Sequence, residues 1–189
     1  MNGTRDTAEN IALIVGGVAA GILGSRLLPP LIASATASAR ARRGGDPFDL
    51  LISDHREILS MLDDMAQQPA DSTGRRLTTY LMFKRKLAKH AMAEEDVVYP
   101  ILHSQGQDPQ ASKHLYDEHA DMKIALFEME ESLKNGTDWK PQVQALRQLI
   151  ASHAREEEEV VFPRLRDMLS SERKPKVSGL ISREEALVL

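Results

Sequence analysis

The chain contains no cysteine, few aromatic residues and no excess of positive charge. The absence of cysteine excludes disulfides, thiolate zinc sites, cysteine-ligated iron–sulfur clusters and a cysteine nucleophile. With 24 Lys and Arg against 28 Asp and Glu, the formal net charge is −4, so there is no overall basic field to hold a nucleic-acid backbone. Any metal ion must therefore be bound by histidine or carboxylate side chains, and no nucleic-acid partner is expected.

The first 45 residues differ in composition from the rest. An uncharged, glycine-rich run extends from Ile11 to Ser25. As a helix it is about 20 Å long, which reaches bilayer thickness only if Arg26 snorkels and the helix continues. Gly17 and Gly21 have the spacing that lets another helix approach closely. We expect an extra N-terminal hydrophobic helix and linker over residues 1–45, with residues 8–33 either contacting a membrane or mediating homo-oligomerisation.

The charges around this run indicate where the chain resides. The first ten residues place Arg5 beside Asp6 and Glu9, which fits a secretory signal poorly. Arginines at positions 40, 42 and 43 would stay on the inner side of a membrane. The expected location is the cytoplasm, with the chain either free or attached to the inner face of a membrane by its N-terminal helix.

Residues 46–170 carry apolar side chains at helical spacing in four segments. The first opens with Asp46 as N-cap and Pro47 behind it, and the others span about 75–103, 108–134 and 138–170. Their predicted inward faces are formed by Phe48, Leu51, Ile52, Ile58, Leu59, Leu62, Met65, Leu77, Leu81, Leu87, Val97, Val98, Ile101, Leu115, Met122, Ala125, Leu126, Met129, Leu133, Val143, Leu146, Ile150, Val160, Val161 and Leu165. Because the connections are short, the predicted fold is all-α, an up-down-up-down four-helix bundle.

The last segment, residues 171–189, begins with a basic, proline-containing link and ends in LISREEALVL. A short helix or a docking peptide is compatible with this composition. The prediction favoured by its position at the end of the chain is a short, mostly mobile C-terminal tail.

The bundle segment contains an internal duplication. LAKHAMAEEDVVYPIL, residues 87–102, and IASHAREEEEVVFPRL, residues 150–165, are identical at nine of sixteen positions. Upstream, LISDHREI and LYDEHADM align His55 with His119. Each half is therefore a helix pair with one histidine on its first helix and His-xxx-Glu on its second.

Six polar residues of the two halves fall on the predicted inward faces. Burying carboxylates and imidazoles in an apolar core is strongly unfavourable without a shared countercharge, and metal ions supply one. The i,i+4 spacing places an imidazole and a carboxylate one turn apart on one helix face. The sequence thus predicts a dinuclear metal site whose donors suit iron, then manganese or zinc. The predicted ligands are His55, His90, Glu94, His119, His153 and Glu157.

This series of histidines and His-xxx-Glu pairs, followed by EDVVYP or EEVVFP, resembles the hemerythrin-like (HHE cation-binding) family over roughly residues 46–170. The resemblance implies a non-haem di-iron centre, bridged by oxo or hydroxo, that binds or reacts with dioxygen, nitric oxide or peroxide, or senses iron and oxygen. By position, one iron would be held by His55 and His90 and the other by His119 and His153. Glu94 and Glu157 would bridge the two.

The sequence departs from the oxygen-carrying members of the family. They have a fifth histidine one turn from the third-helix ligand, but Leu115 and Lys123 occupy those positions here. Four His and two bridging Glu leave roughly one open position on each iron. His103 and His114 are expected at the surface or outside the ligand set.

Other polar and aromatic residues near the motifs receive a plainer interpretation. The acidic residues around the ligands, Glu95 and Glu158 among them, are expected to form a solvated face. Tyr99 and Phe162 are expected to be packing residues beneath the prolines.

The expected function is binding of, or reaction with, a small oxidant in a sensing or stress-protective role. No Ser-His-Asp grouping, phosphate loop or dinucleotide fingerprint is visible, so no catalytic residue is predicted and any enzymatic activity would be redox chemistry at the metal. The alternatives are a di-iron peroxidase or oxidase, and an iron-stabilised interaction module that acts through its terminal segments.

Overall fold

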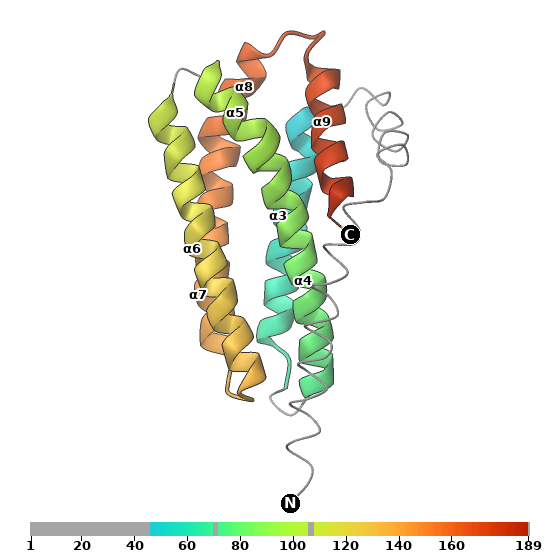
Figure 1. The fold of residues 1–189 in the computed structure, drawn as a ribbon, viewed down its shortest axis with the longest axis vertical. Helices are drawn as coiled ribbons and strands as arrows, with labels where there is room; N and C mark the ends of the chain where they lie inside the picture. The colour runs from blue at the N-terminus through green and yellow to red at the C-terminus, as the bar shows by residue number, and fades with distance from the viewer. Residues whose placement is uncertain (1–45, 70–71, 106–107, 189) are drawn as a thin grey trace, which may run out of the picture.

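The computed structural model describes residues 46–69, 72–105 and 108–188, and these fold into helices without any strand. Figure 1 shows the long helices lying side by side, with consecutive ones running in opposite directions. The prediction of an all-helical bundle is thereby confirmed. The elements in chain order are α3 (Pro47–Ala66), α4 (Thr73–Ala93), η1 (Glu94–Val98), α5 (Tyr99–Ser104), α6 (Pro109–Lys134), α7 (Lys140–Glu156), η2 (Glu157–Val161), α8 (Phe162–Met168) and α9 (Lys174–Leu187).

The predicted helix ends are present with their capping groups. The Asp46 side chain accepts a hydrogen bond from the Phe48 N–H at 2.9 Å, immediately before α3. Asp108 accepts one from the Ala111 N–H at 3.0 Å at the start of α6. Gly136 follows the end of α6 with a φ of +66°, a conformation in which a Cβ atom would be strained. Local sequence signals therefore set where these helices begin and end.

The buried apolar side chains form two clusters, separated along the bundle by the six polar residues. One cluster contains Leu51 and Leu115, and the other contains Ile58 and Met122. Within α3, His55 lies between the two. The predicted site is thus sealed above and below by hydrocarbon.

Two π-helical segments lie at the same place in each repeat. In η1 the Tyr99 N–H donates to the Glu94 carbonyl, and in η2 the Phe162 N–H donates to the Glu157 carbonyl. This is the i to i−5 bonding of a π-turn, inserted without breaking the helix. The wider turn brings the residue five positions after each glutamate over that glutamate, whereas an α-helix would rotate it about 140° away.

Seven predicted inward residues, among them Leu77 and Leu126, are only half-buried, and one is exposed. Val160 is 59% exposed, while the next residue, Val161, is 3% exposed. An α-helical period does not hold through η2, because the π-turn shifts the register of the buried face. The equivalent residue of the first repeat, Val97, is buried in a cluster that also contains Val177 and Ile181 of α9. Only the first repeat has such a covering helix among the described residues.

The prediction of a mobile C-terminal tail is wrong for residues 174–187. They form α9, which packs against α3, α4 and η1 (Figure 1). Pro175 lies in the first turn, and Val177 and Ile181 are one turn apart on the buried face. Two apolar residues at this spacing are enough to dock the helix on an existing core.

The predicted N-terminal helix and its contacts through residues 8–33 lie outside the described residues. In the part of the chain that the structure does describe, no helix is both long and apolar enough to cross a membrane. The division of the chain after residues 45 and 170 stays a prediction.

If α9 is part of the folded unit, truncating its buried face must destabilise the whole bundle. Ile181→Ala is expected to lower the free energy of unfolding by about 3 kcal/mol, because Ile181 is fully buried. Leu180→Ala, at a side chain that is 43% exposed, is the matched control and should change it little. Denaturant unfolding followed by circular dichroism measures both. Equal stability of the two variants would contradict the docking of α9.

Candidate metal centre

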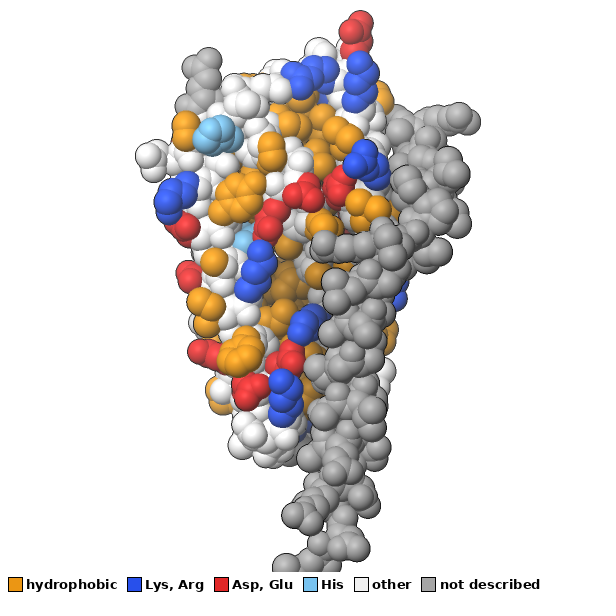
Figure 2. All heavy atoms as spheres, viewed as in Figure 1, with side chains coloured by type: hydrophobic (Ala, Val, Ile, Leu, Met, Phe, Trp, Pro, Cys, Tyr) orange, Lys and Arg blue, Asp and Glu red, His pale blue; other side chains and the backbone are white. Residues whose placement is uncertain are grey.

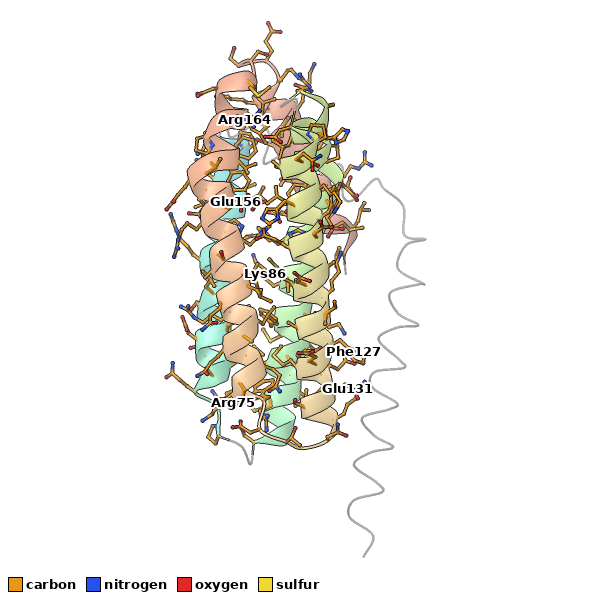
Figure 3. The ribbon with its side chains drawn as sticks, turned by 90° about the vertical axis from the view of Figure 1, so that its left-hand side faces the viewer. Arg75, Lys86, Phe127, Glu131, Glu156 and Arg164 are labelled. Atoms are coloured by element: carbon orange, nitrogen blue, oxygen red, sulfur yellow. The ribbon has the colours of Figure 1, made fainter. Side chains whose placement is uncertain are left out.

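The six predicted ligand residues meet at one level inside the bundle. None of them is more than 3% exposed. Figure 3 shows side-chain nitrogen and oxygen atoms gathered between the helices near the level of Glu156. By contrast, His103 and His114 are exposed, as predicted. The structure thus brings together residues that are more than 100 positions apart in the chain, although their role as ligands stays a prediction.

The donor atoms fall into two groups, each compact enough for one ion. The first contains His55, His90, Glu94 and Glu157, and the second contains Glu94, His119 and His153. Within each group, one donor atom from every residue lies within 4.8 Å of the others. The predicted pairing of the histidines is the pairing that the structure presents.

Each glutamate faces histidines of both groups. Glu94 Oε1 lies 3.0 Å from His90 Nε2, and its Oε2 lies 3.4 Å from His119 Nε2. Glu157 Oε2 lies 3.2 Å from His55 Nε2 and 3.5 Å from His153 Nε2. Glu94 thus belongs to both groups of donor atoms, and Glu157 Oε2 faces one histidine of each group.

Despite this proximity, many of these atoms make no hydrogen bond. Among the six residues, the buried atoms without a regular hydrogen bond are all four carboxylate oxygens of Glu94 and Glu157, both ring nitrogens of His90, and His55 Nε2. An unsatisfied buried polar group costs about 1–3 kcal/mol, and a charged one more. Cations between the imidazoles and carboxylates would satisfy these atoms together, so the residues present fit a metal centre.

Two carboxylates outside the ligand set hold the histidines of the first helix in each repeat. Glu158 Oε1 lies 2.8 Å from His55 Nδ1, and Glu95 Oε1 lies 2.8 Å from His119 Nδ1. In the neutral ring each Nδ1–H donates to its carboxylate, which leaves the Nε2 lone pair directed inward. The expectation that Glu95 and Glu158 belong to a solvated face is therefore wrong. The sequence signal for this role was that a glutamate occupies the same position in both repeats, as Glu95 and Glu158.

A second pair of acidic residues faces the histidines of the second helix. Glu118 Oε2 accepts from His153 Nδ1 at 2.7 Å, and Asp54 Oδ2 lies 3.9 Å from His90 Nδ1. Asp54 and Glu118 each directly precede a predicted ligand, and the repeat alignment places them at the same position. The sequence analysis missed both. Each of the four imidazoles therefore has a carboxylate on its outer side.

Tyr99 reaches the centre as well. Its hydroxyl lies 2.9 Å from His119 Nε2 and 3.4 Å from His153 Nε2, and its side chain is fully buried. The expectation that Tyr99 is only a packing residue is wrong, because the π-turn of η1 directs residue 99 over Glu94. Phe162, its counterpart, does pack as predicted: its ring stacks on His55 with centroids 6.1 Å apart.

The two buried carboxylates control the protonation of the histidines. Burial lowers the pKa of His55, but the neighbouring Glu157 and Glu94 outweigh it and raise that pKa to about 10. Glu94 and Glu95 likewise overcome burial at His119 and raise its pKa to about 9. Without an ion, protons on these two rings offset the carboxylate charges at pH 7.

The pKa values of His90 and Glu157 shift toward the neutral forms, and that of Glu94 toward the charged form. Burial lowers the pKa of His90. Burial and the charge of Glu94 raise the pKa of Glu157 to about 7, whereas Glu94 itself has its pKa held well below the usual value, because the histidines around it outweigh its burial. The protons on His55 and His119 are therefore the ones that a bound cation would displace.

A third group of residues that could bind a metal ion, His114, Glu118 and Glu156, lies outside the core. His114 Nε2 is 3.4 Å from Glu156 Oε2 and 3.6 Å from Glu118 Oε1. The His114 side chain is 56% exposed. It contacts the centre only through Glu118, so it serves as a histidine control for the buried four.

Comparisons with known proteins cover the same part of the chain. The model of the hemerythrin HHE cation binding domain matches residues 46–165, which include all six predicted ligands. A DNA nickase of Nostoc sp. (strain PCC 7120 / SAG 25.82 / UTEX 2576) is 29% identical over 126 residues, 66% of this chain and 34% of the relative. The chain thus spans about a third of the length of that curated relative. No solved structure matches the chain.

The outer carboxylates should affect metal affinity without being ligands. Glu158→Ala is expected to weaken Mn²⁺ binding about 10- to 100-fold, because His55 loses the partner that orients its ring. Glu159→Ala, at the exposed neighbouring position, should leave the affinity unchanged. Calorimetric titration of the metal-free chain measures both. An unchanged affinity in Glu158→Ala would show that the outer hydrogen bond has no orienting role.

Metal binding should also depend on pH. At pH 7 the protons held by His55 and His119, with pKa values of about 10 and 9, must leave before a cation binds. Affinity should therefore rise with pH, by about tenfold per unit for each proton displaced. Mn²⁺ titrations at about pH 6, 7 and 8, in two buffers of different ionisation enthalpy, count the protons released. A flat affinity over this range would contradict the exchange.

Proposed function

The chain belongs to the hemerythrin HHE cation-binding domain family, and we propose that its bundle holds a pair of iron ions that bind or react with a small oxidant. The oxidants of suitable size and chemistry are dioxygen, nitric oxide and peroxide. The role we propose is sensing of such a molecule or protection against it.

One observation carries this proposal: no oxygen of the buried Glu94 and Glu157 accepts a hydrogen bond of regular geometry, although imidazole nitrogens of four histidines lie 3.0 to 3.6 Å from these oxygens. In our proposal His55 and His90 would hold one ion, and His119 and His153 the other, with the two glutamates between them. Four nitrogens and two carboxylates without a thiolate suit iron. When bound, iron supplies reversible electron transfer and coordination positions for a small ligand.

The chain's own contribution is orientation and exclusion of water. Carboxylates accept from Nδ1 of His55, His119 and His153, so these rings are held before any ion arrives. Above and below, the two apolar clusters close the centre to bulk water. Leu115, fully buried, occupies a position where a fifth histidine ligand would be needed. Coordination positions thus stay available to an external molecule.

A direct contact between the centre and the C-terminal helix favours sensing over turnover. α9 packs against η1, the segment that begins with Glu94. Val97 of η1 shares a cluster with Val177 and Ile181 of α9. A shift of Glu94 on ligand binding would therefore act on α9 without an intermediate element.

A nickase function is not proposed. That name belongs to a relative of which the chain covers 34%. The net charge is −4, and the face drawn in Figure 2 mixes acidic, basic and hydrophobic side chains. Neither feature favours binding of a phosphate backbone.

Iron content and its response to oxidants test the proposal. The purified chain should hold a pair of iron ions, and its absorption spectrum should change on exposure to air, nitric oxide or peroxide. His90→Ala and Glu157→Ala should lower bound iron at least about tenfold, since each loses a donor atom at the centre. His114→Ala is the matched control and should keep its iron. Equal loss from His114→Ala, or no iron in the unmodified chain, would overturn the assignment.

Peroxide consumption with an added reductant separates the sensing role from an enzymatic one. A sensor should form a stable adduct and stop after stoichiometric reaction. Sustained turnover would instead establish the peroxidase alternative at the same centre.

A further inference from the structure

The two halves of the centre differ in one residue type. Tyr99 and Phe162 occupy the same position of the repeat, each five residues after a bridging glutamate and directly before a proline. Both backbone N–H groups close the π-turn on that glutamate. The backbone is therefore equivalent at the two sites, and only the side chains differ.

On the Phe162 side, the residue adds only hydrocarbon. Its ring stacks on His55 with an interplanar angle of 5°, and on Phe48 with centroids 4.9 Å apart. On the Tyr99 side, a hydroxyl oxygen lies 2.9 Å from His119 Nε2 and 3.4 Å from His153 Nε2. An oxygen atom has thus been placed in one half of the centre and is missing from the other.

Once an ion has replaced the protons on the imidazoles, the hydrogen bonds around Tyr99 no longer fully satisfy its hydroxyl oxygen. Nδ1 of His119 is engaged by Glu95 and Nδ1 of His153 by Glu118, so both Nε2 atoms then present lone pairs inward. These two nitrogens are only 3.2 Å apart. A single phenol hydrogen can satisfy one of them, whereas a cation satisfies both together with the phenol oxygen.

We propose that the Tyr99 oxygen is a further ligand of the ion held by His119 and His153, and that Phe162 denies such a ligand to the ion held by His55 and His90. This inference rests on the proposed function. The phenol releases its proton to solvent as its oxygen binds the cation. Ferric iron, a hard cation, accepts such an oxygen donor together with imidazole and carboxylate. The pair of ions is then inequivalent, with the open position on the His55 side.

Tyr99→Phe tests the assignment with spectroscopy. Phenolate on ferric iron absorbs visible light by charge transfer from oxygen to metal, and resonance Raman excitation in that band enhances the phenolate ring modes. The iron-loaded, oxidised full-length chain should show the band and these modes, and Tyr99→Phe should lose both. The variant should fold, because the second repeat already carries Phe at this position. Circular dichroism checks that its helix content is unchanged.

Tyr116→Phe is the matched control. Tyr116 packs edge-on against Tyr99, but its hydroxyl donates to the Glu95 carbonyl and the side chain is 40% exposed. It should keep the band, the ring modes and the iron. Mössbauer spectra should resolve two distinct iron environments in this control and in the unmodified chain, and the two should become more alike in Tyr99→Phe.

The outcomes separate this inference from the function on which it rests. Loss of the band in folded Tyr99→Phe, with iron retained or lost, supports ligation as long as Tyr116→Phe keeps both. A band that persists in Tyr99→Phe, or an iron-loaded unmodified chain without a band, overturns the tyrosine assignment and leaves the di-iron proposal intact. A chain that binds no iron overturns both.

Discussion

Two carboxylates in an apolar core are the constraint from which the rest of this structure follows. Glu94 and Glu157 are completely buried, and neither could stay ionised there without positive charge nearby. The fold surrounds them with four imidazoles, two of which are protonated at neutral pH when no cation is present. These two protons partly offset the carboxylate charges in the metal-free bundle.

The outer carboxylates extend the same electrostatic pattern toward the surface. Glu95 and Glu158 each follow a buried glutamate in the chain and reach across to a histidine on another helix. The His119 and His55 rings therefore lie between an inner and an outer carboxylate. In each pair of adjacent glutamates, one contacts histidines from inside the site and the other contacts a histidine from its outer side. The hydrogen bond from His119 lowers the pKa of Glu95.

Duplication gives the centre its symmetry, and three local differences break it. Tyr99 in place of Phe162 adds a buried hydroxyl to one half. α9 covers Val97, while the equivalent Val160 faces solvent. His114 and Glu156 add exposed donors beside one half, at positions that the repeat alignment matches to Leu50 and Ala93. The two halves of the candidate metal centre are therefore chemically different.

The order of helices, their caps and the six inward polar residues were all readable from the sequence, because helical periodicity and local capping depend on residues close together in the chain. The place of Tyr99 at the centre could not be predicted, because α-helical spacing rotates residue 99 away from Glu94 and only the π-turn returns it. The docking of α9 was equally hidden, because Val177 and Ile181 are too few to mark a core helix until the surface they cover exists. The repeats match Glu95 with Glu158, but the role of the outer carboxylates did not follow from that match, because their partners lie on other helices and only the assembled bundle brings them within hydrogen-bond distance. Sequence alone thus determined which residues could bind metal, and tertiary packing decided which other residues orient them and where the two halves differ.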